Sequence, residues 1–140
     1  MPDLPYFAAS TVGAEAAKKV AAAAVAEARK NNFMMAIAVV DTAGNLVYFE
    51  KMDGTQTGSV NVSIEKARSA ALFKRATKAF QDAVAQGGVG LRMLGLPGAV
   101  PVEGGIPLIE GGKIVGAIGA SGGTSEQDGQ CAQAGANLMK

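Results

Sequence analysis

The sequence predicts a single α+β domain in which helices pack on an antiparallel sheet. The chain has 140 residues, of which 49% are apolar. This is the length of one domain, which buries roughly 70% of the surface that its unfolded chain exposes. Two pairs of strand-like runs are each joined by a short turn containing glycine, as in antiparallel hairpins. Helical segments precede, separate and follow these hairpins, an order that favours α+β over a parallel, doubly wound sheet.

The first expected element is a helix from Thr11 to Lys30. This segment is rich in alanine and has no internal proline, and Glu15 precedes Lys19 by four residues, as on an exposed helix face. Asn31 and Asn32 are expected to end the helix. Small residues form its packing face and allow it to lie close to a sheet; they are Ala17, Val20, Ala21, Ala24 and Ala28.

Residues 35–41 and 46–51 are predicted to form the first hairpin. The connection, residues 42–45, contains Gly44, which can adopt the left-handed conformation that such a turn needs. Both runs carry apolar residues at neighbouring as well as alternate positions. We therefore expect both strands to lie inside the sheet, with both of their faces covered.

Two helices and an irregular segment are expected next. Ser59 can cap the first helix and Thr77 can start the second, which runs to Gly87. The segment from Gly88 to Pro101 is apolar but interrupted by glycine and proline, so it either packs over the core or closes over a ligand. The first of these helices has apolar residues at helical spacing, namely Val60, Ile64, Ala67 and Ala71.

The second hairpin is predicted from residues 106–110 and 113–120. Gly111 and Gly112 join them as a two-residue turn of the kind that requires positive φ. A last helix is expected from Ser125 to about Met139, with Ser125 and Asp128 as its capping box.

The composition excludes several kinds of chemistry. The chain has no histidine, which removes the usual general base near neutral pH, the Ser-His-Asp and Cys-His mechanisms, and histidine zinc sites. Cys131 is the single cysteine, so an intrachain disulfide is impossible, and we interpret it as a buried helix residue. No metal site is therefore predicted.

Charge and hydropathy indicate the expected partners and location. The net charge is +1, with basic and acidic residues interspersed, so no basic face is available for nucleic acid. The sequence has no basic and apolar run typical of a signal peptide, and no apolar stretch that could span a membrane. We expect a cytoplasmic protein without nucleic-acid or membrane partners.

Glycine is concentrated in one part of the chain, because 13 of the 19 glycines lie between Gly87 and Gly123. The loop 121–125 leaves a strand and enters a helix, so its amides and the positive end of the helix dipole favour a carboxylate, carbonyl or phosphate group. The alternative is a tight bend whose dipole is already satisfied by Glu126 and Asp128. No Walker motif closes the glycine run.

Lys66 is the candidate reactive side chain. Ser63 and Lys66 match a Ser-x-x-Lys pattern, but the chain has neither companion motif of the acylating enzymes that use it. A lysine beside an apolar pocket can act as a base or hold an anionic ligand. The alternative is a solvated lysine paired with a neighbouring acid.

The sequence resembles the GlcG/HbpS-like family, often described as haem-degrading or haem-binding and related to the C-terminal domain of PduO-type corrinoid adenosyltransferases. The resemblance rests on residues 36–54, 63–71, 104–108 and 114–128, in the family's order and spacing. It implies a profilin-like domain with a five-stranded antiparallel sheet. Residues 1–140 would form this single domain, with 1–10 as an N-terminal extension, and assemble into homo-oligomers from dimers to octamers.

The resemblance also implies a ligand pocket. Its lining would be the helix that carries Lys66 and two glycine loops, with the residues Gly104, Gly105, Ile106, Pro107, Ser121, Gly122 and Gly123. One cation, backbone amides and an apolar wall suit a small oxyanion or carbonyl compound.

Three functions remain open from the sequence. The first is binding of a small molecule in a catabolic pathway. The second is an enzyme of isomerase, lyase or hydrolase type, with Lys66 as base or electrostatic anchor and the glycine-loop amides holding an oxyanion. The third is haem binding or storage; the absence of histidine argues against it, although Met, Tyr, Cys or Lys can also ligate haem iron.

Overall fold

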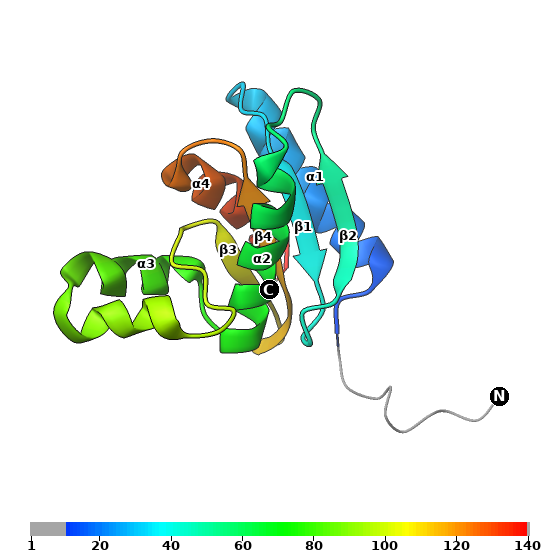
Figure 1. Cartoon of the computed structure of the whole chain (residues 1–140). Helices are drawn as coiled ribbons and strands as arrows, with labels where there is room; N and C mark the ends of the chain where they lie inside the picture. The colour runs from blue at the N-terminus through cyan, green and yellow to red at the C-terminus, as the bar shows by residue number, and fades with distance from the viewer. Residues whose placement is uncertain (1–10, 140) are drawn as a thin grey trace, which may run out of the picture.

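The computed structural model describes residues 11–139 and places one antiparallel sheet between two layers of helices (Figure 1). The strands of the sheet lie in the order β2-β1-β4-β3. Helices α1 and α4 cover one face, and α2 covers the other. The elements are α1 (Ala14–Lys30), β1 (Ala36–Val40), β2 (Leu46–Lys51), α2 (Gly58–Phe73), α3 (Thr77–Gln86), η2 (Gly88–Gly95), β3 (Gly105–Glu110), β4 (Lys113–Ser121) and α4 (Ser125–Ala136).

Strand β1 shows how the two halves of the core are built. Ile37 and Val39 belong to the cluster under α1 and α4, whereas Ala38 and Val40 belong to the cluster under α2. This alternation is that of a strand with both faces buried, so the prediction is confirmed for β1. It is wrong for β2, which is an edge strand; its Leu46 is 50% exposed.

Helix α2 lies unusually close to the sheet. A Cβ atom on Gly119 of β4 would overlap the carbonyl oxygen of Ser63, and one on Gly105 of β3 would overlap that of Lys66. Apart from Lys66, the buried face of α2 consists of small residues, namely Ser59, Ser63, Ala67, Ser69, Ala70 and Ala71. Lys66 belongs to this closely packed helix, and its side chain is buried in the protein interior.

The sheet has four strands in the described residues, not the five that the family resemblance implied. The two hairpins predicted from sequence account for all four, and the segment between α3 and β3 forms the 3₁₀ helix η2 instead of a strand. The profilin-like description stays a prediction, and the N-terminal extension, 1–10, lies outside the described residues.

Much of the segment Gly88–Pro101 is exposed, although its end contacts the core, where the Val100 N–H donates to the hydroxyl of the buried Ser69 at 3.1 Å. Its η2 portion pairs with α3 as an outlying helical hairpin (Figure 1). Val89, Leu91 and Leu94 are 76%, 49% and 63% exposed. No residue of η2 is buried.

The predicted turns and helix ends are mostly confirmed. Gly111 and Gly112 have φ of 57° and 77°, as their hairpin requires, and Gly87 ends α3 with φ of 72°. Helix α1 ends at Asn31, but it begins at Ala14 instead of Thr11. No helix in the described part of the chain is long and apolar enough to span a membrane.

Candidate functional site

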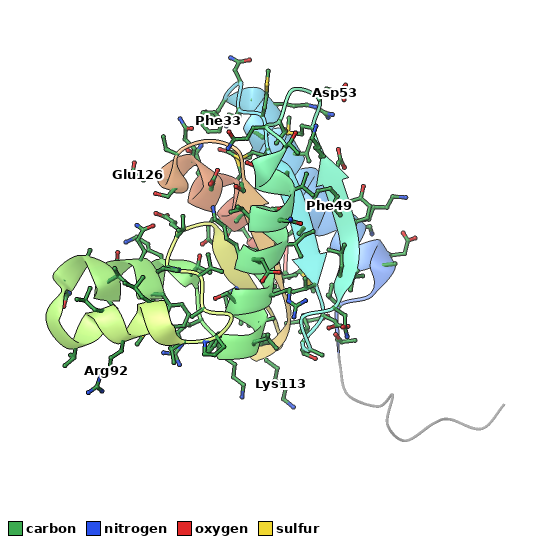
Figure 2. The ribbon with its side chains drawn as sticks, in the orientation of Figure 1. Phe33, Phe49, Asp53, Arg92, Lys113 and Glu126 are labelled. Atoms are coloured by element: carbon green, nitrogen blue, oxygen red, sulfur yellow. The ribbon has the colours of Figure 1, made fainter. Side chains whose placement is uncertain are left out.

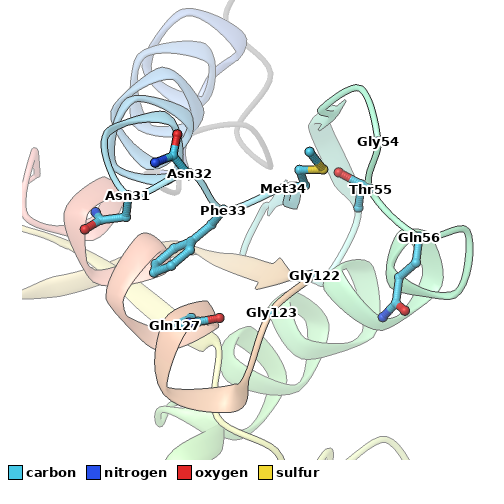
Figure 3. Close-up of a pocket in the computed structure, with 10 residues that line it drawn as sticks. All are labelled: Asn31, Asn32, Phe33, Met34, Gly54, Thr55, Gln56, Gly122, Gly123 and Gln127. Carbon is cyan, nitrogen blue, oxygen red and sulfur yellow. The ribbon is translucent and has the colours of Figure 1, made fainter.

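A polar pocket of about 500 Å³ opens where three segments meet: the turn after α1, the loop between β2 and α2, and the start of α4 (Figure 3). We call it the Thr55 pocket. Figure 3 shows the Phe33 ring directed toward α4 along one wall. The residues that line the pocket are Asn31, Asn32, Phe33, Met34, Gly54, Thr55, Gln56, Gly122, Gly123 and Gln127.

Thr55 gives the pocket its most unusual atom. The side chain is 5% exposed, yet its hydroxyl is the one buried side-chain polar atom that lacks a hydrogen-bond partner within residues 11–139. Its backbone N–H donates to Met52 O at 3.1 Å, which fixes the loop. Leaving a buried hydroxyl unpaired costs about 1–3 kcal/mol, so this atom is a candidate partner for a water or a ligand atom that enters the pocket beside it.

The glycine loop forms another wall of the pocket. A Cβ atom on Gly122 would overlap the carbonyl oxygen of Met34, so only glycine lets the loop approach the start of β1 this closely. The N–H of Gly123 donates to Oδ1 of Asp128 at 2.9 Å. From the sequence, this amide is a candidate hydrogen-bond donor to an anionic ligand. In the structure it already donates to a carboxylate of the protein.

The N-cap of helix α4 is Thr124, one residue before the predicted Ser125. The Thr124 hydroxyl accepts the N–H of Gln127 at 3.2 Å. The Gln127 side chain accepts the N–H of Thr124 at 3.0 Å in return. The predicted pair of Ser125 and Asp128 is wrong, because the Asp128 carboxylate turns inward to Gly123.

Lys66 is buried behind the glycine loop. Its ammonium donates to Oδ2 of Asp128 at 2.8 Å and to the carbonyl oxygen of Ala120 at 3.1 Å. The Lys66 and Asp128 side chains are 1% and 4% exposed. The sequence-based alternative of a solvated lysine is wrong, although its pairing with an acid is confirmed. Lys66 is absent from the lining of the Thr55 pocket.

The Gly104-Gly105 segment packs directly on Lys66. A Cβ atom on Gly104 would lie 2.6 Å from the oxygen of Ala120 and 2.8 Å from Nζ of Lys66. The N–H of Gly105 donates to the Thr77 hydroxyl at 2.9 Å. These glycines close the space around the lysine instead of opening onto a pocket.

The remaining predicted site residues lie in two other places. Ile106 and Pro107 line a second pocket of about 400 Å³ between β3 and the end of α4, separate from the residues of the Thr55 pocket. Ser121 is buried, with its hydroxyl 3.2 Å from that of Ser59. Of the eight predicted site residues, Gly122 and Gly123 line the Thr55 pocket.

Sequence reasoning missed most of the lining of this pocket. In the sequence, Asn31 and Asn32 indicate only a helix end, and Thr55 and Gln56 are two polar residues between the first hairpin and the next helix. The sequence signal for these residues is that amide and hydroxyl side chains are concentrated where helices and strands begin or end. Their convergence depends on the strand order, in which β1 is the neighbour of β4 and brings the end of α1 beside the start of α4.

Cys131 has the inert environment that the sequence predicted. The side chain is fully buried on α4. Burial raises the pKa of its thiol to about 12, and the charges of Glu27 and Asp128 act in the same direction. Among the described residues, no group of three carboxylate or cysteine side chains could hold a metal ion.

Sequence comparison identifies the family. The family model for "haem degrading protein HbpS-like" matches residues 12–137. The GlcG protein of Escherichia coli K12 is 38% identical over 105 residues, which cover 75% of this chain and 77% of GlcG. The chain belongs to the HbpS-like family, and its resemblance to GlcG and HbpS is confirmed.

Solved structures support the same family. A double mutant of Streptomyces reticuli HbpS is 29% identical, with a TM-score of 0.86, and the match covers 100% of this chain and 95% of HbpS. The protein PduOC, solved as a haem complex, is 26% identical, with a TM-score of 0.82 and coverage of 93% and 96%. These relatives share the arrangement of helices on an antiparallel sheet.

Proposed function

We propose that this protein binds a small molecule, an oxyanion or a carbonyl compound, in the Thr55 pocket, and that it does so in a catabolic pathway in the cytoplasm. The observation that carries the proposal is Thr55, a residue that lines a polar pocket and whose buried hydroxyl lacks a partner within residues 11–139. A ligand oxygen would complete its hydrogen bonding. Because the hydroxyl has no protein partner in the ligand-free state, a ligand can hydrogen-bond to it without breaking a bond within the protein.

The test compares ligand binding in three proteins by saturation-transfer NMR. The probes are lactate, pyruvate, lactamide and hydroxyacetone, and the proteins are wild type, Thr55→Val and Thr55→Ser. We expect at least one probe to bind wild type and Thr55→Ser and to lose about tenfold in affinity in Thr55→Val, the loss of about one hydrogen bond. Equal binding by all three proteins, or no binding together with no ligand retained in native mass spectrometry, would contradict the proposal.

An enzymatic function with Lys66 as base has less support. The Lys66 ammonium contacts Asp128 and Ala120, and a base or anchor must reach the substrate. The same side chain can hold the glycine loop in place through Asp128, which is a positioning role. Turnover of a carbonyl probe that disappears in Lys66→Met while the variant remains folded would favour the enzyme.

Haem binding is a second candidate because the neighbour PduOC was solved as a haem complex. The donor set of the Thr55 pocket does not fit tight ligation: Met34 supplies a thioether, and the lining includes no histidine, tyrosine or cysteine. Titration with haemin distinguishes the two functions. We expect that adding the wild-type protein leaves the spectrum of free haemin unchanged. A Soret band that appears with wild type and weakens in Met34→Leu would instead favour haem binding.

We also propose a homo-oligomer. The proposal is supported by the exposed apolar side chains of η2, Val89, Leu91 and Leu94, since contiguous exposed apolar surface is typical of protein interfaces. Light scattering after size exclusion gives the subunit number. We expect a mass of at least two chains for wild type and a smaller particle for Leu94→Lys; a monomeric wild type would contradict the proposal.

A further inference from the structure

We infer that the ligand of the Thr55 pocket is a small uncharged molecule rich in hydroxyl or carbonyl oxygens, and that the pocket discriminates against anions. The inference rests on the proposed small-molecule site, and it changes the ligand class: it excludes the oxyanions and adds polyols to the carbonyl compounds. It depends on four features of the pocket: its side chains, the two helix ends that meet there, the pairing of nearby charges, and the unpartnered hydroxyl.

The lining side chains carry dipoles but no formal charge. Four of the ten residues are carboxamides, and none is Asp, Glu, Lys or Arg; the carboxamides are Asn31, Asn32, Gln56 and Gln127. A carboxamide offers both donors and an acceptor, so it pairs with either a hydroxyl or a carbonyl group. An anion in such a pocket would lose part of its hydration without gaining a cationic partner.

The two helix ends at the pocket have opposite polarity. Helix α1 ends at Asn31, so its negative end lies at one wall. Helix α4 begins beside Gly123, and its positive end lies at another wall. Because the pocket is placed between these ends, the attraction of an anion to α4 is offset by repulsion from α1.

The positive end of α4 is also already compensated by protein groups. The first turn contains Glu126 and Asp128. The Asp128 carboxylate accepts the Gly123 N–H, and the Gln127 side chain accepts the Thr124 N–H. An anionic ligand would therefore approach two carboxylates and find these two amide donors engaged.

The buried cation next to this loop is compensated as well. Lys66 pairs with Asp128 at 2.8 Å, so the two charges cancel behind the wall formed by Gly123. A hydroxyl on the ligand can both donate to and accept from the Thr55 hydroxyl, whereas a carboxylate can only accept. Phe33 and Met34 add apolar surface that suits the C–H groups of a small polyol or hydroxycarbonyl compound.

The test uses pairs of probes that match in size and differ in charge: lactamide with lactate, and erythritol with erythronate. Binding is followed by the backbone amide shifts of Gly122 and Gly123 in ¹⁵N-labelled full-length protein. We expect each neutral probe to bind at least about tenfold more tightly than its anionic partner, with an affinity that added salt does not change, because salt screens only charge interactions.

A charge variant provides the control. Glu126 is exposed and does not line the pocket, so Glu126→Gln is expected to leave the affinity for erythritol unchanged and to raise that for erythronate severalfold. Equal or tighter binding of the anions to wild-type protein would overturn the inference and leave the proposed function intact. Absence of any shift with all four probes, in a protein that also retains no ligand, would overturn both.

Discussion

The Lys66 ammonium lies 2.8 Å from the Asp128 carboxylate, in a pair that is almost fully buried between α2 and α4. The second carboxylate oxygen accepts the N–H of Gly123 at 2.9 Å. Figure 2 shows α2 crossing in front of the sheet, and α4 packs on the opposite face, so the pair joins helices from the two faces. One side chain of α2 is thereby connected to the loop that forms a wall of the Thr55 pocket.

Removing the cation is expected to destabilise the protein strongly. Lys66→Met leaves the Asp128 carboxylate buried without its partner, at an expected cost of about 3–5 kcal/mol in the free energy of unfolding. Urea unfolding followed by circular dichroism measures this cost. The double variant Lys66→Met/Asp128→Asn is expected to recover part of it.

The exposed pair of Lys78 and Asp82 provides the matched control. Its atoms lie 2.9 Å apart, almost the same distance, but both side chains are 53% exposed. Lys78→Met should therefore change the free energy of unfolding by no more than about 0.5 kcal/mol. Equal unfolding midpoints for Lys66→Met and Lys78→Met would show that the buried pair has no structural role.

Thr55→Val is expected to preserve or raise stability while weakening ligand binding. The valine removes a buried hydroxyl that has no partner and keeps the side-chain volume, so the free energy of unfolding should be unchanged or up to about 1 kcal/mol higher. Thermal unfolding of the ligand-free protein checks this. A loss of more than about 1 kcal/mol would mean that the hydroxyl has a partner in the folded protein.

Gly104→Ala should disturb the contact between β3 and Lys66. The new Cβ would lie 2.6 Å from the Ala120 oxygen, and φ at this position is 137°. We expect a loss of at least about 2 kcal/mol in the free energy of unfolding, since both overlap and backbone strain contribute. Gly58→Ala in α2 is the control, because a Cβ there meets nothing within 4 Å; its stability should remain unchanged or rise by up to about 1 kcal/mol.

The Cys131 thiol should be unreactive in the folded protein. Its pKa is raised from 9.0 to about 12, chiefly by burial, so it stays protonated at pH 8. Ellman's reagent is expected to react with it only after unfolding in urea. Rapid reaction of the native protein would contradict this burial.

The same shift gives a pH dependence of stability. Because the unfolded thiol ionises at lower pH than the folded one, the contribution of Cys131 to stability is complete below about pH 9. It is lost as the pH rises toward about 12. Cys131→Ala should therefore show a shallower fall in unfolding free energy above pH 9 than wild type, and equal slopes would contradict the assignment.

Much of the fold could be predicted because local patterns specify it. Gly111 and Gly112 define one hairpin turn, and the alanine-rich segment before Asn31 defines α1. The half-exposure of β2 could not be predicted, because the hydropathy of a strand does not reveal whether it has one neighbour or two. The outward-facing residues of η2 were missed for a similar reason, since apolar side chains in an irregular segment resemble a buried loop.

The candidate site was only partly predictable. Glycine pointed to the loop at Gly122, which lines the Thr55 pocket, because a close approach of two backbones requires glycine. The concentration of glycine also led to the prediction that Gly104 contacts a ligand. In the structure Gly104 packs on the Lys66 side chain instead. Thr55 carried no sequence signal of its own, since the absence of a hydrogen-bond partner is a property of its surroundings in the fold.

The central claim, that the Thr55 pocket is the ligand site, is tested most directly by mapping amide shifts with a neutral probe such as erythritol. We predict that the perturbed amides cluster at residues 31–34, 54–56, 122–123 and 127, which line this pocket. Perturbations centred on Ile106, Pro107 and the end of α4 would instead place the ligand in the second pocket and contradict the account.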